Sequence, residues 1–444
     1  MKLKWSDIPF APAKLPFFYG WVVLAVCTLS IVSSIPGQTM GVGIFTDALM
    51  DALGLSRTQL SLAYALGTIA SGLFLTRAGR YIDRHGLRVM GALSAAGLGL
   101  SLVLMSRATD LAAILPLPRM FAAMATVFVC FMSLRFFGQG CLTMVARVGI
   151  GQWFNRRRGR AVALMGLVTA FCFSVSPKYL NHLLETHGWQ GASLILAALA
   201  GFGMTALALL FFRDRPEDCG LTMDGVPEPV TEGETGLPLP VQREFTLREA
   251  TRTLAFWAYN LGPASQGLIV TALTFHLASI GEQAGLGREA AYSIFIPMAF
   301  FSVTTNMVGG WLSDRINLKW LLLYMTFMQF VGTAGLAAFG TPLGRWAIIV
   351  GFGSSGGLFS TMTTVPFPRY FGRAHLGAIS GLGMSIMVYA SAIGPYFFSK
   401  GLDLFGSYQA VILACLALPI ATGTLGALAR DPQQIAARDK ERAD

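Results

Sequence analysis

Long uninterrupted apolar segments constrain this chain more than any other feature of its sequence. A helix needs about 20 apolar residues to cross the hydrocarbon core of a membrane. Lipid offers the backbone no hydrogen-bond partners, so only helices and closed barrels can cross it, and the lack of alternation within these segments excludes a barrel. Only 13% of the 444 residues are charged. We therefore predict an all-α integral membrane protein with twelve transmembrane helices.

The apolar segments fall into two groups of six. The predicted spans lie at 17–45, 57–78, 89–106, 120–150, 161–181 and 191–212, and then at 254–279, 290–310, 320–339, 345–366, 377–399 and 408–428. This spacing predicts an N-terminal six-helix bundle at 1–212, a cytosolic linker at 213–252, a C-terminal six-helix bundle at 253–430 and a cytosolic tail at 431–444. The linker is rich in proline and acidic residues, as surface linkers are.

One ten-residue turn occurs twice, as GRYIDRHGLR from Gly79 and as GWLSDRINLK from Gly310, with a constant offset of 231 residues. The shared positions are Gly79, Asp83, Arg84, Gly86 and Arg88 in the first copy, and Gly310, Asp314, Arg315, Asn317 and Lys319 in the second. Glycine and asparagine tolerate the positive φ of a tight reversal. The aspartates can accept hydrogen bonds from the free N–H groups of a nearby helix N-terminus. We therefore predict that these residues form two gating turns.

A second basic turn, WFNRRRGRA at 153–161, has its counterpart in YFGRAHLGA at 370–378, which pairs Phe154 with Phe371 at an offset of 217. Pro177 pairs with Pro395 at an offset of 218. Two landmarks at nearly one offset indicate that the halves are parallel repeats. In transporters built this way the substrate site lies near the bilayer midplane between the halves, and we expect the same here.

The net charge of +10 follows the membrane rather than a nucleic acid. With both termini in the cytosol, 24 of the 33 Lys and Arg residues fall in predicted cytosolic segments. This asymmetry is the positive-inside pattern of membrane proteins. We expect lipid as a partner, no nucleic acid, and a monomer in a bacterial inner membrane.

Sequence motifs for cofactors and metals give no support to an enzyme. The chain has no His-Glu-x2-His pattern and no Gly-x4-Gly-Lys-(Ser/Thr) loop, and its six cysteines form no Cys-x2-Cys pair. GFGSSG at 351–356 matches a dinucleotide-binding pattern, but it lies inside an apolar span with no strand before it. We interpret it as small-residue helix packing and expect no cofactor, no metal and no catalytic residue.

Arg135 lies about halfway along the fourth predicted span, and no carboxylate lies at that depth in any span. An unpaired guanidinium in the bilayer interior costs about 2.5–3.5 kcal/mol on insertion scales. An anionic ligand would supply the missing charge, and Gln139, four residues on, would share the helix face. The alternative is a structural role in which Arg135 bonds only carbonyl or polar groups of neighbouring helices.

Other polar side chains in the spans are candidates for the same site. Histidine side chains in general titrate near neutrality, so His276 is a candidate for substrate binding and for carrying a coupled proton, or it is a neutral histidine bonded within its bundle. Each remaining candidate, taken alone, is more often a helix-packing contact. These residues are Gln38, Tyr64, Asn260, Gln266, Ser354, Ser355 and Tyr389.

The duplicated turn resembles the loop signature of the major facilitator superfamily. YGWVV at 19–23, PGQTMGVGIF at 36–45 and WFNRRRGRAVALMG at 153–166 resemble its monocarboxylate transporter and oxalate/formate antiporter branch. This resemblance implies a carrier of small carboxylates, often with a proton, that rocks two bundles about a central site. Members of that branch commonly carry an Arg in span 8 and sometimes a Lys in span 11, and this chain has neither.

Our leading hypothesis is a secondary active transporter of a small organic anion, resembling a monocarboxylate, that is coupled to protons and works by alternating access. One alternative is an exporter of hydrophobic or drug-like compounds, although a cationic substrate would favour a buried carboxylate that the spans lack. A second is a membrane sensor that does not transport. That function would favour a folded output domain, and the only predicted soluble segments are the linker and the tail.

Overall fold

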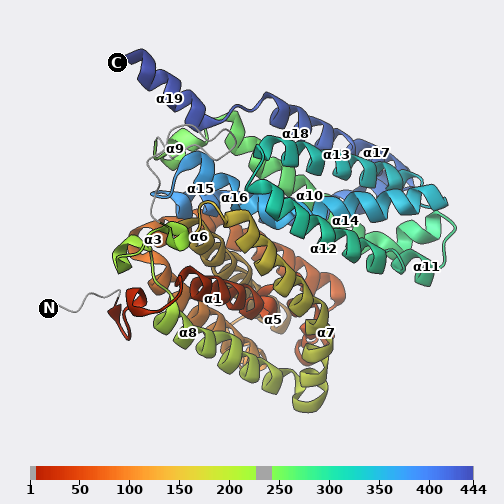
Figure 1. Ribbon diagram of the computed structural model, residues 1–444. Coiled ribbons are helices and arrows are strands. Elements are labelled where there is room, and N and C mark those ends of the chain that lie inside the picture. Colours follow the sequence, from red (N-terminus) through yellow and green to blue (C-terminus); the bar gives the residue numbers. More distant parts are fainter. Residues whose placement is uncertain (1–6, 227–242, 444) are drawn as a thin grey trace. The chain divides into compact units, whose positions relative to one another are not determined.

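A computed structural model describes residues 7–226 and 243–443, and within these ranges the chain is helical without any strand (Figure 1). The longer elements of the first half are α1 (Gly20–Ser33), η3 (Ile35–Gly37), α2 (Thr39–Leu53), α3 (Arg57–Ser106), α4 (Ala108–Ile114), α5 (Arg119–Leu134), η4 (Arg135–Leu142), α6 (Thr143–Trp153), α7 (Arg158–Leu196), η5 (Ala197–Gly203) and α8 (Met204–Phe211). The middle of the predicted linker lies outside the described residues.

The second half continues with the same kind of element. Its helices are α9 (Leu247–Ala250), α10 (Leu254–Gln283), α11 (Arg288–Tyr292), α12 (Phe295–Ser313), α13 (Leu318–Ala337), α14 (Pro342–Thr364), α15 (Pro366–Phe371), α16 (Leu376–Phe405), α17 (Gln409–Cys415), α18 (Ala417–Leu428) and α19 (Pro432–Ala443). Three single turns, η2 (Pro12–Lys14), η6 (Glu217–Cys219) and η7 (Met223–Gly225), flank the helices of the first half.

The number of membrane crossings agrees with the prediction of twelve. In the described part of the chain, nine continuous helices are long and apolar enough to cross a membrane. Two of them are divided by a glycine with positive φ, Gly86 at 84° and Gly188 at 66°, into parts that are each long enough to cross. The first predicted span is the broken helix formed by α1, η3 and α2. The predicted fold class is confirmed.

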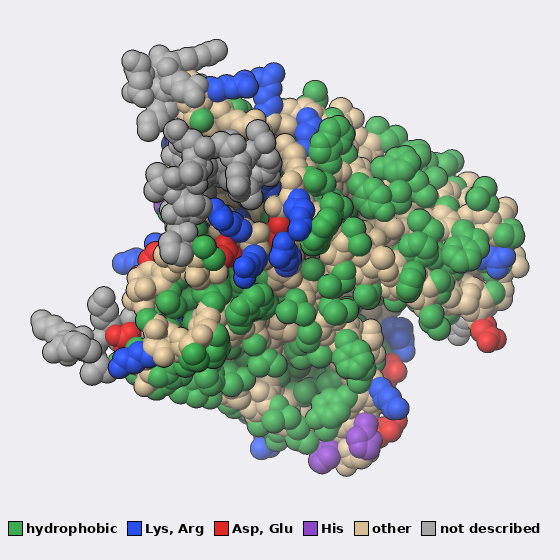
Figure 2. Space-filling model, in the orientation of Figure 1, with side chains coloured by type: hydrophobic (Ala, Val, Ile, Leu, Met, Phe, Trp, Pro, Cys, Tyr) green, Lys and Arg blue, Asp and Glu red, His purple; other side chains and the backbone are tan. Residues whose placement is uncertain are grey.

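The chain divides into two compact units. The first unit contains Met1–Phe154, Val168–Pro229 and Ser380–Ser385, and the second contains Asn155–Leu167, Val230–Ile379 and Ile386–Asp444. Over most of the visible helical surface of both units, apolar side chains face outward (Figure 2). Phe171 in the first unit is 70% exposed and Ile296 in the second is 83% exposed. Outward-facing apolar side chains are what lipid contact requires of an integral membrane protein.

Small residues set the helix spacing within each unit. In the first unit, a Cβ atom built on Gly201 would lie 2.3 Å from the Cα of Gly99, so α3 and η5 pack backbone against backbone. In the second, a Cβ on Gly351 would lie 2.3 Å from the backbone nitrogen of Gly332, which brings α14 against α13. Gly351 begins the GFGSSG stretch, which confirms that this stretch serves helix packing.

Candidate functional site

The break in the first span exposes backbone groups inside the first unit. Pro36 and Gly37 lie in the single turn η3, and Gln38 then takes an extended conformation before α2 begins. Proline cannot continue an α-helical hydrogen-bond ladder, so carbonyl groups near the break need other partners. The Gly37 carbonyl finds one in a side chain from the fourth span.

That side chain comes from a second irregular segment, η4, which is a π-helix over Arg135–Leu142. Turns of this kind are rare and often occur at functional sites. The segment packs directly against the break, because a Cβ atom on Gly37 would lie 2.3 Å from the carbonyl oxygen of Leu134 and 2.9 Å from the Cα of Gly138. Glycines at 37 and 138 therefore allow the two irregular backbones to touch.

Arg135 begins the π-helix and is only 2% exposed. Its Nη1 atom donates to the carbonyl oxygen of Gly37 at 3.3 Å and to the hydroxyl of Thr39 at 3.2 Å. The guanidinium carbon lies 5.4 Å from the ring centroid of Tyr64, whose hydroxyl donates to the same Thr39 oxygen at 3.0 Å. A ring face attracts a cation, so the charge is balanced by dipoles and a π-system.

Two buried polar atoms, on Arg135 and on Gln139, have no hydrogen-bond partner in the described ranges. Among the described residues, Arg135 has no acidic partner, and its buried Nε atom has no hydrogen-bond partner. The buried Oε1 atom of Gln139 has no partner there either. A buried polar atom without a partner costs about 1–3 kcal/mol. The Nε donor of Arg135 and the Oε1 acceptor of Gln139 therefore have no partner within the described part of the chain.

The other predicted polar candidates are distributed over both units. In the first unit, Gln38 donates to the hydroxyl of Ser34 at 2.9 Å. In the second, Asn260 donates to the Phe256 carbonyl of its own helix at 2.7 Å, and Gln266 accepts from Ser355 at 2.9 Å. The rest are the buried Ser354 and the half-buried Tyr389.

His276 is bonded on both ring nitrogens within the second unit. Its Nε2 atom lies 3.0 Å from the Pro395 carbonyl oxygen, and its Nδ1 atom lies 3.0 Å from the hydroxyl of Tyr408. That hydroxyl also lies 3.2 Å from the hydroxyl of Ser279. The carbonyl can only accept, so Nε2 carries the hydrogen in the neutral ring and Nδ1 accepts from Tyr408. His276 lies in the last third of α10, nearer to its end than to its middle.

The second copy of the duplicated turn binds a helix N-terminus. The Asp314 carboxylate accepts from the backbone N–H groups of Gly159 at 2.6 Å and Arg160 at 3.1 Å, in the first turn of α7. The Nε atom of Arg160 lies 3.8 Å from the same carboxylate. Burial raises the pKa of the Asp314 carboxyl, and the two backbone N–H groups lower it by less.

A second acid, Asp214, packs against the first copy of the turn. Gly86 has a φ of 84°, and a Cβ atom there would lie 2.2 Å from the Asp214 carboxyl carbon. Asp214 accepts from the N–H of Arg88 at 3.0 Å, and the Arg88 side chain donates to the carbonyls of Leu209 and Ile8 at 2.6 and 2.7 Å. Asp83 is half-buried nearby.

A family model that matches most of the chain identifies the family to which it belongs. The model described as Major Facilitator Superfamily matches residues 24–395, which is most of the chain. The chain belongs to the major facilitator superfamily. The predicted resemblance to this superfamily is thereby confirmed.

The curated relatives of this superfamily member carry different substrate names. Human "Monocarboxylate transporter 11" is 27% identical over 288 residues, 62% of this chain and 57% of that protein, so the match spans less than two thirds of that relative's length. A Deinococcus radiodurans protein named "Putative sugar efflux transporter" is 26% identical over 406 residues, 90% of this chain and 95% of that one.

Two solved superfamily structures share the fold. The human organic anion transporter MFSD10 (TETRAN) aligns with a TM-score of 0.59 at 16% identity, covering 93% of this chain and all of that one. The Escherichia coli fucose:proton symporter FucP aligns with a TM-score of 0.62 at 13% identity, covering 92% of this chain and 99% of that one. At these identities the likeness concerns the fold alone.

Three residues of this transporter were not anticipated from its sequence. Thr39 accepts a hydrogen bond from Arg135, the hydroxyl of Tyr408 bonds His276, and Asp214 accepts from Arg88 in the first copy of the duplicated turn. A signal existed for Asp214, because Arg213 and Asp214 recur as Arg430 and Asp431 at the 217-residue offset, and a proline follows each pair within two residues. Tyr408 gives no such signal, since it lies 132 residues from its partner in an ordinary turn.

Proposed function

We propose that this superfamily transporter is a secondary active carrier of a small organic anion that resembles a monocarboxylate. The observation that carries the proposal is Arg135, a buried guanidinium without an acidic partner among the described residues and with an unused Nε donor. A carboxylate can accept two parallel hydrogen bonds from one guanidinium, which neutral oxygens such as those of Gly37 and Thr39 do not replace. The name of the monocarboxylate relative supports this substrate class.

We infer that a proton accompanies the anion and that His276 carries it. Protonation would make both ring nitrogens donors, and both neighbours can adapt: the Pro395 carbonyl accepts already, and the Tyr408 oxygen can accept while its hydrogen turns to Ser279. The imidazole can therefore gain a charge without moving its neighbours. In this proposal the protein is a monomer in a bacterial inner membrane with both termini in the cytosol, and it works by alternating access with the duplicated turns as gates.

A sugar is the second candidate substrate. The Deinococcus relative named for sugar efflux matches 90% of this chain, which is more than the monocarboxylate relatives match. A neutral sugar would be bound by amides and hydroxyls and would need no buried cation. The two candidates therefore differ in their dependence on Arg135.

Uptake by the purified protein in proteoliposomes tests the proposal. Arg135→Lys keeps the charge but loses the two parallel N–H donors of the guanidinium, and Arg135→Gln loses both the charge and these donors. Each variant is expected to lower uptake of radiolabelled small monocarboxylates at least tenfold. Lys178→Gln is the matched control, because Lys178 is an exposed cation of α7. Wild-type uptake from the Arg135 variants would overturn the anion proposal.

A binding measurement covers variants that fold but do not turn over. Monocarboxylates at 100 times their dissociation constant should stabilise the wild-type protein by about 2.7 kcal/mol and the folded Arg135 variants much less. Stabilisation by neutral sugars with no response to carboxylates would favour the second candidate.

A further inference from the structure

The two copies of the duplicated turn differ in what occupies the start of the following helix. In the first unit, the Asp214 carboxylate lies against Gly86 and accepts from the N–H of Arg88 at 3.0 Å. A negative group thus occupies the positive end of the helix dipole. The chain supplies this anion itself, from the segment that follows α8.

The second unit does not repeat this arrangement. Asn317 stands where Gly86 would be, and its own side chain accepts from the N–H of Lys319 at 2.9 Å. Asp431 stands where Asp214 would be, but it accepts from the N–H of Gln433 at 2.9 Å, in the first turn of α19. The carboxylate that caps the helix in one half therefore serves another helix in the other half.

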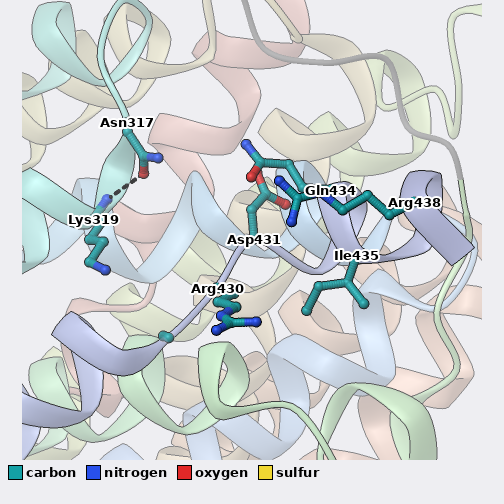
Figure 3. A pocket seen from close by; sticks show the side chains of 8 residues that line it. Asn317, Lys319, Arg430, Asp431, Gln434, Ile435 and Arg438 are labelled. Atoms are coloured by element: carbon teal, nitrogen blue, oxygen red, sulfur yellow. Dashed lines mark hydrogen bonds between the residues drawn. The ribbon is translucent and has the colours of Figure 1, made fainter.

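A cavity of about 300 Å³ lies at this place in the second unit (Figure 3). Its walls come from the start of α13, from the segment between α18 and α19, and from α19. The lining residues are Asn317, Lys319, Ala429, Arg430, Asp431, Gln434, Ile435 and Arg438.

The cavity is positively charged. Lys319, Arg430 and Arg438 contribute three cations against the one carboxylate of Asp431. Lys319 donates its ammonium group to the Ala427 carbonyl, which fixes that charge beside the cavity. Within the described ranges the side chains of Arg430 and Arg438 have no hydrogen bond and no ion pair, and both residues are exposed. Two guanidinium groups with all their donors available therefore line one hollow.

We propose that this cavity, beside the start of α13, binds a phosphate group between the side chains of Arg430 and Arg438. Guanidinium groups bind phosphate oxygens through paired hydrogen bonds, and a helix N-terminus adds a favourable dipole. The cavity lies where one apolar helix, α13, begins and another, α18, ends. A phospholipid headgroup or free phosphate can supply the same chemistry there.

A double variant of the full chain tests the site. Arg430→Gln with Arg438→Gln removes two charges from the cavity, and Arg248→Gln with Arg252→Gln is the control, because these two arginines are also exposed but do not line it. Each protein is purified in a neutral detergent. Its melting temperature is then followed against phosphatidylglycerol, phosphatidylcholine or inorganic phosphate.

The expected result is a saturable rise in melting temperature for the wild-type protein and the control, with at least a fivefold weaker half-saturation in the cavity variant. A rise with phosphatidylglycerol but not with inorganic phosphate identifies a lipid headgroup, and a rise with inorganic phosphate identifies a soluble ligand. Equal responses from the cavity variant and the wild-type protein would overturn the proposal. Equal losses in the cavity variant and the control would do so too, since they would indicate surface charge alone.

Discussion

The carboxylate of Asp314 accepts a hydrogen bond from the backbone N–H of Gly159 at 2.6 Å, although 155 residues separate them. The bond joins the end of α12 to the beginning of α7, and Arg160 adds a second N–H donor at 3.1 Å. The helices also touch through small residues, since a Cβ atom on Gly310 would lie 2.6 Å from the Gly159 carbonyl oxygen. In the second copy of the duplicated turn, Asp314 and Gly310 therefore both contact the N-terminus of α7.

Removing the acceptor should loosen the first turn of α7. Asp314→Ala leaves the N–H groups of Gly159 and Arg160 without a partner, at a cost of about 1–3 kcal/mol. Asp314→Asn keeps an oxygen in place. Hydrogen exchange of the peptide covering 155–167 should therefore accelerate about tenfold or more in Asp314→Ala and change little in Asp314→Asn. Equal exchange in Asp314→Ala and the wild-type protein would show that the two bonds do not hold this turn.

The pH dependence of stability provides a separate test of the same acid. Burial raises the pKa of the folded Asp314 carboxyl above its ordinary value, so the folded protein binds this proton more tightly than the unfolded chain does. Its contribution to stability therefore rises as the pH falls from neutrality through the raised pKa. Asp314→Asn lacks this contribution, so its melting temperature should equal or exceed that of the wild-type protein at pH 7 and lose that advantage toward pH 4. A pH-independent difference would contradict this expectation.

Close packing at the broken span gives a prediction about stability. Gly37→Ala would place a Cβ atom 2.3 Å from the Leu134 carbonyl oxygen, and overpacking of this kind costs about 1–3 kcal/mol. Gly43→Ala is the matched control, because a Cβ atom at Gly43 in α2 meets nothing within 4 Å. Melting temperature in detergent should fall for Gly37→Ala and stay unchanged or rise for Gly43→Ala. Similar values for the two variants would show that the break and the π-helix are not tightly packed.

Apolar length made the twelve spans predictable, because lipid leaves the backbone no alternative to a helix. The isolation of Arg135 was predictable for a similar reason, since the absence of an acid can be read directly from the sequence. Its partners were not predictable. One is the Gly37 carbonyl, a backbone group that every residue type carries. The π-helix that begins at Arg135 was not predicted from the sequence either.

Contacts between distant segments were the hardest to anticipate. The spacing of the second turn predicted that Asp314 would meet a helix N-terminus, but not that the helix would be α7. Asp214 and Tyr408 act through partners 126 and 132 residues away, and such pairings depend on how helices pack rather than on any local pattern.

The first copy of the duplicated turn contains Gly86, whose substitution can be compared with that of another glycine of positive φ. Gly86→Ala combines an unfavourable φ of 84° with a Cβ atom 2.2 Å from the Asp214 carboxyl carbon. Gly188→Ala has a similar backbone, with a φ of 66° and a ψ of 173°, and its Cβ atom meets only the Gln190 side-chain oxygen at 3.8 Å, so it carries the backbone strain alone. Holding a non-glycine residue in such a sparsely populated region costs about 1–3 kcal/mol. Gly86→Ala should therefore lower the melting temperature clearly more than Gly188→Ala, and equal losses would show that Asp214 does not pack on the turn.

The proton role proposed for His276 makes a prediction about the pH profile of uptake. His276→Gln cannot titrate, so its uptake between pH 5.5 and 8 should lose the pH dependence of the wild-type protein. Tyr408→Phe keeps the imidazole but removes the oxygen 3.0 Å from Nδ1, so the charged ring loses one acceptor. Uptake by Tyr408→Phe should therefore keep a pH dependence that His276→Gln lacks.

The exposed His182 supplies the control, since His182→Gln removes a histidine of α7 that makes no side-chain hydrogen bond among the described residues. Its pH profile should match that of the wild-type protein. The decisive comparison is between His276→Gln and Tyr408→Phe at matched protein amounts in proteoliposomes. A wild-type pH profile in His276→Gln would remove the proton role, because the glutamine at this position cannot titrate. The two hydrogen bonds of His276 would then serve only to fasten α10 to α16 and to the turn before α17.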